Sequence, residues 1–113
     1  MDNAEVTIDV ASPIPIITVA GEIDVATVPL LSRRIEEIPV GSPAVIVDLS
    51  ELTFIDSSGL SALVTCHNRL QNGEHQGVVQ LVVSRPAILN LLTITGLLEI
   101  FQVVATMEEA TTG

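Results

Sequence analysis

Residues 44–49, with the sequence AVIVDL, form a short and almost unbroken run of β-branched and aliphatic side chains. A strand of this composition is typically covered on both faces, as in parallel sheets with helices packed on them. Residues 78–83 form a second run of the same kind, and a helical pattern lies between the two. Strands that alternate with helices predict a largely parallel sheet with right-handed crossovers.

The remaining strands are expected near the two ends of the chain. Residues 6–10 alternate apolar and polar side chains, which is the period of a half-exposed strand. Residues 14–20 form a second strand that can pair with the first in antiparallel fashion, and Gly21 would end it or bulge it. Residues 100–104 predict a last strand at the sheet edge, followed by a polar tail over residues 106–113.

Three helices follow from apolar side chains at helical spacing. The first ends before Pro39, the second near Asn72 and Gly73, and the third runs from Pro86 to about Gly96. Their inner faces carry Val28, Leu31, Ile35 and Ile38, then Leu60, Leu63, Val64, His67 and Leu70, then Ile88, Leu91 and Leu92.

The predicted fold is a single α/β domain over residues 1–113. Its core would be a mixed, largely parallel sheet of about five strands with helices packed against it. A turn over residues 50–53 is expected between the strand at residues 44–49 and the second helix.

The charge of the chain restricts its partners. Fourteen acidic residues face four basic ones, all arginines, and the net charge is -10. This charge repels nucleic acids and anionic membrane surfaces. It suits a partner with a basic face, or it simply maintains solubility. Arg33 and Arg34 are expected on an exposed face beside Glu36 and Glu37.

We expect a soluble cytoplasmic protein without a cofactor. No secretory pattern is visible at the N-terminus, and polar residues interrupt the longest apolar stretch, residues 88–104. The single cysteine, Cys66, is expected to be a buried and inert thiol. Asp48 and Glu51 could approach a cation, but nothing else completes an oxygen ligand set, so we predict no metal site.

Residues 56–59, with the sequence DSSG, open the second predicted helix. Asp56 or Ser57 can accept hydrogen bonds from the free N–H groups of its first turn. A phosphate on Ser57 would lie at the positive end of the helix dipole. Gly59 has no side chain and would allow a partner to approach closely. Helix capping alone also explains these residues.

A Ser/His/Asp hydrolase is disfavoured on geometry. If Ser57 begins a helix, His67 lies ten residues along it, or roughly 15 Å away. His75 would follow the end of that helix in a solvated loop. Asp56 adjoins the serine and cannot also orient a distant imidazole. We therefore do not expect the chain to be an enzyme.

Three segments together resemble the STAS domain family, and specifically its bacterial anti-sigma factor antagonists. They are VAGEIDVAT at residues 19–27, VIVDLSELTFIDSSGLSAL at residues 45–63 and SRPAILNLLTITGLLEIFQV at residues 84–103. They occur in the order of the family and cover nearly the whole chain. The fold of that family agrees with the strand and helix order predicted above.

The resemblance implies a switch between partners. In such systems the unphosphorylated antagonist binds an anti-sigma factor that is also a serine kinase, and a sigma factor is released. The kinase then phosphorylates the first serine of the motif, here Ser57, and the complex dissociates. A PP2C-type phosphatase restores the hydroxyl group.

The same resemblance suggests which residues contact the partner. These would be Asp24, Asp56, Ser57, Ser58 and Gly59, with Ser58 the weaker candidate for phosphorylation. Asp24 could instead only cap the first helix. A second hypothesis is a free-standing STAS subunit of a transport or stress-sensing complex. The oligomeric state stays open.

Overall fold

The computed structural model describes residues 3–72 and 76–112. It contains one sheet whose strands lie in sequence order, and four α-helices with one short 3-10 helix. The elements are β1 (Ala4–Asp9), β2 (Ile16–Ile23), α1 (Val28–Glu36), β3 (Ala44–Ile55), α2 (Ser57–Gln71), β4 (Val78–Val82), α3 (Pro86–Ile94), η1 (Leu97–Glu99), β5 (Gln102–Val104) and α4 (Met107–Thr112).

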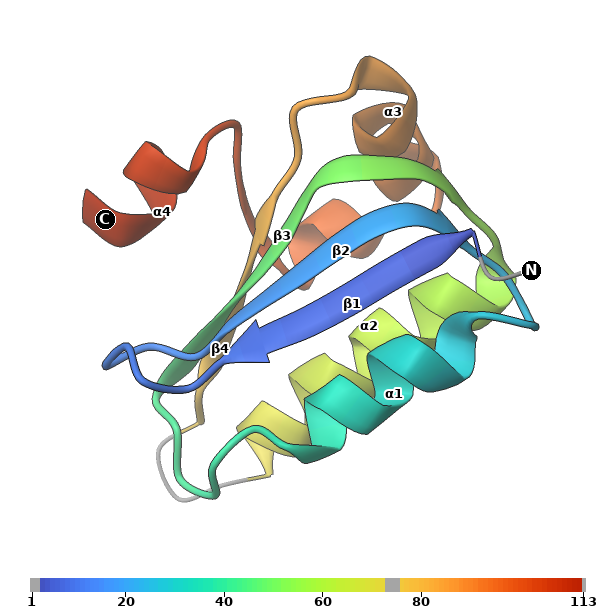
Figure 1. The fold of residues 1–113 in the computed structure, drawn as a ribbon. Helices are drawn as coiled ribbons and strands as arrows, with labels where there is room; N and C mark the ends of the chain where they lie inside the picture. The colour runs from blue at the N-terminus through green and yellow to red at the C-terminus, as the bar shows by residue number, and fades with distance from the viewer. Residues whose placement is uncertain (1–2, 73–75, 113) are drawn as a thin grey trace.

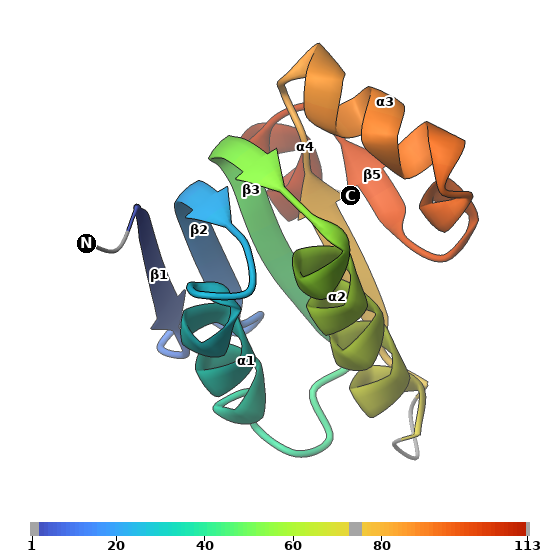
Figure 2. The same ribbon diagram turned by 90° about the vertical axis from the view of Figure 1, so that its right-hand side faces the viewer.

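The sheet is mixed, as the sequence predicts. β1 pairs with β2 in antiparallel fashion, and the pairs β2–β3, β3–β4 and β4–β5 are parallel. Helices α1 and α2 lie side by side on one face, and α3 lies near the other end of that layer (Figures 1 and 2). The α/β class with five strands is therefore confirmed.

The main core lies between the sheet and helices α1, α2 and α3. Successive strand residues point to opposite faces, so Val45 and Val47 enter this core while Ile46 faces the other side. Cys66 is fully buried in the core, as expected, and burial raises the pKa of its thiol to about 12.

The turn predicted over residues 50–53 is wrong, because β3 continues without a break to Ile55. Its inward residues Leu49, Leu52 and Ile55 are buried, although they are spaced by three residues and a regular strand needs a spacing of two. At two points in the β2–β3 pairing, β3 has one residue more than β2. Each extra residue shifts the alternation of β3, so that Leu49, Leu52 and Ile55 all face the core. The polar residues in this segment point outward and do not end the strand.

The predicted polar tail is also wrong, because residues 107–112 form helix α4. Ala110 is buried and packs with Ile46 and Val82 on the second face of the sheet, with Met107 beside it. Met107 and Ala110 are three residues apart, so they share one side of the helix. Figure 2 shows α4 behind the strands, on the side away from α1 and α2.

Candidate functional site

The DSSG segment lies where β2 and β3 end side by side. Ile23 and Ile55 are paired across these parallel strands, and the amide of Asp56 donates to the carbonyl of Ile23 at 3.1 Å. Asp24 and Asp56 each follow one of these strand ends. The carboxyl ends of parallel strands in α/β folds are a common location for binding sites.

Of the two caps that the sequence allows for α2, Asp56 and Ser57, the N-cap is Asp56. Its backbone is extended, and its carboxylate accepts from the amides of Ser58 at 2.9 Å and Gly59 at 3.3 Å. The hydroxyl of Ser58 donates to the same oxygen at 2.5 Å. The Ser58 hydroxyl is the main cause of the lowered pKa of Asp56, and the two amides add to it.

The charge of Asp56 should therefore contribute to stability in a pH-dependent manner. Because its pKa is lower in the folded chain than the ordinary 3.8, the contribution is complete above that value and is lost as the pH falls through the lowered pKa. We expect Asp56→Asn to lower the thermal midpoint near neutrality, and the difference from wild type to shrink as the pH falls below 3.8. Thermal unfolding followed by circular dichroism over this range measures it.

The exposed Glu51 provides the control, since Glu51→Gln removes a charge without removing a cap. A difference between Asp56→Asn and wild type that stays constant with pH would contradict a charge-dependent cap.

Ser57 and Ser58 differ sharply although they are neighbours in sequence. Ser58 is half-buried and its hydroxyl is held by Asp56. Ser57 is exposed, it is the first residue of α2, and its hydroxyl makes no hydrogen bond with any described residue. A kinase or a binding partner can therefore reach the Ser57 hydroxyl without first breaking a contact.

Asp24 is not the N-cap of α1, which is Thr27. The Asp24 carboxylate accepts from the amides of Ala26 at 3.0 Å and Thr27 at 3.1 Å, and the Asp24 amide donates to the Thr27 hydroxyl at 2.9 Å. This reciprocal pair resembles a capping box placed before the helix. It fixes the loop that follows β2, directly beside the start of α2.

Gly59 is buried, so its missing side chain does not open the surface to a partner. A Cβ atom at this position would lie 2.5 Å from Cγ1 of Ile55 and 2.8 Å from Cγ2 of Ile23. The glycine therefore allows α2 to pack directly against the ends of β2 and β3. This packing is the reason the structure gives for glycine at this position.

We expect Gly59→Ala to destabilise the domain, since overpacking of this kind costs about 1–3 kcal/mol and outweighs the better helix propensity of alanine. Denaturant unfolding measures the free energy directly. Ser61→Ala, an exposed change on the same helix, should stay within about 0.5 kcal/mol of wild type. Equal stabilities of the two variants would show that Ile23 and Ile55 yield without cost.

An open groove of about 470 Å³ begins at Ser57 and runs between α2 and the end of α3. Three large apolar side chains next in sequence to residues of this region are exposed: Val25 (77%) follows Asp24, Phe54 (47%) precedes Ile55 in β3, and Ile94 (73%) ends α3. Exposed apolar side chains are common in protein-binding surfaces. The groove is lined by Ser57, Leu60, Ser61, Val64, Thr65, Thr95 and Leu97.

The structure does not bring the residues of a hydrolase together. His67 packs its ring edge-on against Phe101, with the ring centroids 5.9 Å apart. His75 lies outside the described residues. Across residues 3–72 and 76–112, no three His, Cys, Asp or Glu side chains are grouped so that they could hold a metal ion.

Comparison with known proteins identifies the family. The sequence profile described as the STAS domain matches residues 5–110, which is nearly the whole chain. The chain belongs to the STAS domain family. This confirms the resemblance seen in the three sequence segments. None of the described helices is both long and apolar enough to cross a membrane.

Two similar proteins are both described as anti-sigma factor antagonists. The anti-sigma-F factor antagonist RsfB of Mycobacterium tuberculosis is 30% identical, over 99% of this chain and 90% of the relative. A crystal structure of an anti-sigma factor antagonist from Mycobacterium paratuberculosis is also 30% identical, with a TM-score of 0.85 over 96% of this chain and 92% of that one.

The fold is shared with more distant STAS structures as well. The anti-sigma factor antagonist SpoIIAA in its unphosphorylated form is 21% identical, with a TM-score of 0.75 over 95% of this chain and 93% of that one. Helix α2 and the neighbouring strands thus belong to an architecture that the family retains at low sequence identity.

Proposed function

We propose that this chain is an anti-sigma factor antagonist whose binding is switched off by phosphorylation of Ser57. One observation carries the proposal: at the first position of α2, beside an open groove, the hydroxyl of Ser57 is exposed and makes no hydrogen bond with a described residue. The similarity to RsfB over nearly the full length of both chains supports an anti-sigma factor as the partner.

The partner would contact the surface around the start of α2. Asp24, Asp56, Ser57 and Ser58 supply its polar part, while Gly59 lies beneath and keeps the helix close to the strands. The exposed apolar residues named above supply its hydrophobic part. A surface with a polar centre and apolar surroundings suits a specific and reversible complex.

Phosphorylation would change this surface without changing the fold. A phosphate adds about -1.5 to -2 charges beside Asp56 and Asp24, so a partner that fits the neutral hydroxyl is repelled. The N-terminus of α2 stabilises negative charge, and no hydrogen bond between the Ser57 hydroxyl and a described residue has to break.

The serine would act as a substrate for other proteins. A kinase, which we propose is the anti-sigma factor itself, transfers the γ-phosphoryl group of ATP to the Ser57 oxygen, and ADP and the hydroxyl proton are released. A PP2C-type phosphatase hydrolyses the phosphoserine with water and restores the hydroxyl. The chain performs no catalysis in this scheme, which would take place in the cytoplasm.

Incubation with candidate anti-sigma kinases and ATP, followed by intact mass measurement and site mapping, tests the proposal. We expect one phosphate, located on Ser57, which is absent in Ser57→Ala and present in Ser58→Ala. Phosphate on Ser58 would contradict the assignment of the acceptor. If no anti-sigma kinase binds the unmodified chain, the antagonist function itself is wrong, and a free-standing subunit of another complex is favoured.

A further inference from the structure

The outer edge of β1 is the feature that the proposed function does not use. The amide of Glu22 donates to the carbonyl of Asn3 at 2.9 Å, which makes these residues a hydrogen-bonded pair at the start of the β1–β2 ladder. Hydrogen-bonded and non-hydrogen-bonded pairs alternate in antiparallel ladders. The N–H and C=O groups of Ala4, Val6 and Ile8 therefore point away from β2, toward the free edge.

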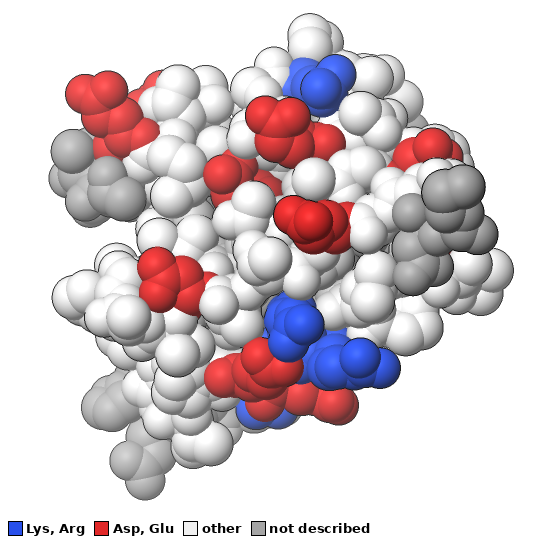
Figure 3. Space-filling view, in the orientation of Figure 1, with Lys and Arg blue, Asp and Glu red and all other residues white. Residues whose placement is uncertain are grey.

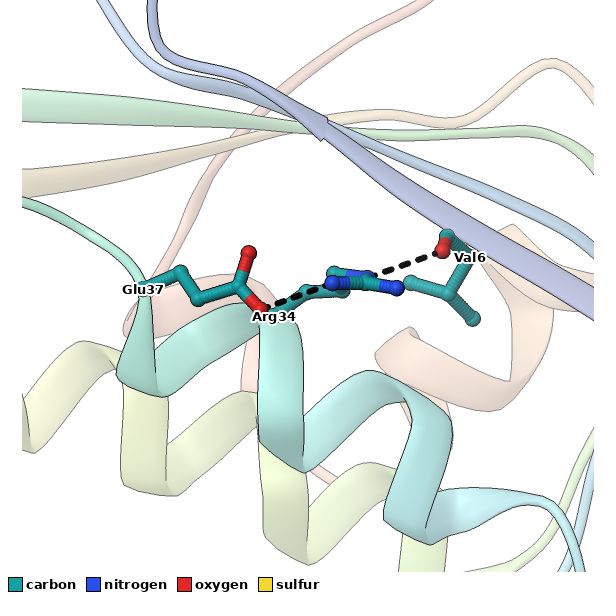
Figure 4. A network of polar contacts seen from close by, with 3 residues as sticks. All are labelled: Val6, Arg34 and Glu37. Atoms are coloured by element: carbon teal, nitrogen blue, oxygen red, sulfur yellow. Dashed lines mark hydrogen bonds and ion pairs between the residues drawn. The ribbon is translucent and has the colours of Figure 1, made fainter.

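Arg34 of α1 reaches this edge. Its Nε donates to the carbonyl of Val6 at 3.2 Å, and its Nη1 pairs with Oε2 of Glu37 at 2.7 Å. Figure 4 shows the guanidinium between the carboxylate of Glu37 and the backbone of Val6. The Arg34 and Glu37 side chains remain 35% and 42% exposed, so this pair lies at the surface of the molecule.

The rest of the edge is open. Among the described residues, no hydrogen bond reaches the outward N–H and C=O groups of Ala4 and Ile8. A strand with such unpaired groups is a template for pairing with another strand. The opposite edge of the sheet is less suited to pairing, because β5 has only three residues.

The sequence of β1 is compatible with pairing to a second copy of itself. An antiparallel arrangement about a two-fold axis at Val6 would place Glu5 opposite Thr7, so no two acidic residues face each other. Its central hydrogen bonds would join the N–H and C=O groups of the two Val6 residues. The carbonyl that they need is the one that Arg34 occupies.

We propose that Arg34 blocks the free edge of β1, so that the β1 strands of two copies of this chain do not pair into one continuous sheet. The guanidinium donates to the central acceptor of the edge and places a charged group beside it, a common way to protect an edge strand. Glu37 holds the guanidinium in place. The net charge of -10 adds a weaker repulsion between copies that salt would screen.

Replacement of Arg34 by methionine tests this role, because Met keeps an apolar stem and lacks the guanidinium. We expect Arg34→Met to dimerise with a dissociation constant lower than that of wild type by roughly tenfold, as expected for one freed backbone acceptor. Added salt should strengthen this dimer. Sedimentation and light scattering over a concentration series measure it.

Arg33→Met is the matched control, since it makes the same change of charge at an exposed position of the same helix. Amide hydrogen exchange locates the contact: Ala4, Val6 and Ile8 should become protected with increasing concentration in Arg34→Met alone. A monomeric Arg34→Met at high salt, or equal dimerisation of both variants, would overturn the proposal.

Arg34→Lys and the wild-type chain provide two further tests if Arg34→Met folds poorly. Lysine keeps the charge but lacks the guanidinium group that binds Val6 and Glu37 together, so we expect partial dimerisation. In wild type, the Nε proton of Arg34 should exchange with water more slowly than that of Arg33. Equal exchange would mean that the contact between Arg34 and Val6 does not persist in solution. The proposal that Arg34 blocks the edge of β1 would then be wrong.

Discussion

Gly21→Ala should lower the free energy of unfolding by roughly 2–4 kcal/mol, the largest effect of any single methyl group discussed for this chain. Gly21 lies inside β2 with a φ of +91°, where an L side chain is strained. A Cβ atom there would be 1.9 Å from the carbonyl oxygen of Asn3. The start of β1 would have to move, and the bond from Glu22 to Asn3 would be lost.

Gly41→Ala is the matched control for this prediction. Gly41 has a similar φ of +84°, but apart from its chain neighbours no described residue lies within 4 Å of its added Cβ. Its substitution should cost about 1 kcal/mol from backbone strain alone. Urea unfolding of both variants separates the two contributions. Equal losses would mean that the close approach of β1 to Gly21 contributes nothing.

Ser57→Asp should weaken binding to the anti-sigma partner by at least about tenfold, while the thermal midpoint changes little. The carboxylate would add negative charge beside Asp56 at the centre of the proposed contact surface. Because the Ser57 hydroxyl makes no hydrogen bond with a described residue, no structural contact is removed. Calorimetric titration with the partner and thermal unfolding measure the two effects.

Two variants sharpen this experiment. Ser57→Ala should bind like wild type, since the lost hydroxyl makes no hydrogen bond with a described residue. Asn68→Asp introduces the same charge at an exposed position of α2 outside the groove and should change binding much less. If Ser57→Asp and Asn68→Asp bind equally well, local charge at Ser57 does not control the complex.

The distribution of charge explains why a local change can dominate. Figure 3 shows acidic side chains spread over one face of the molecule, while most of the basic side chains on that face lie close to acidic ones at its lower edge. A partner that approaches this chain therefore already meets a negative surface, with a net charge of -10. In the proposed switch, the effect of the added phosphate would come from its position beside Asp56.

The order of strands and helices could be predicted from sequence because each buried run has a clear period. The region of residues 50–53 could not, since its polar side chains read as a turn while Leu49, Leu52 and Ile55 keep facing the core. This spacing is compatible with a strand because of two register irregularities, which lie opposite residues 18–20 and 21–22 of β2. These irregularities depend on a neighbouring strand and leave no local signal.

The candidate site was predictable in part. Asp56 was expected as a possible cap, but two adjacent serines offer the same hydroxyl chemistry. Only the structure shows that the Ser58 hydroxyl donates to Asp56, while the Ser57 hydroxyl makes no hydrogen bond with a described residue. The packing role of Gly59 was missed because it depends on Ile23 and Ile55, which belong to two different strands. Neither contact can be read from the sequence of the helix.

The absence of any described hydrogen bond to the Ser57 hydroxyl has a consequence for how such a protein would store information. A conformational switch relaxes as soon as its ligand leaves, since the state is held only by binding energy. Here the proposed state is written in a covalent bond on a residue that the fold does not depend on. The chain would stay phosphorylated after the kinase dissociates, until a phosphatase removes the phosphate. The lifetime of the phosphorylated state would then be independent of the stability of the domain.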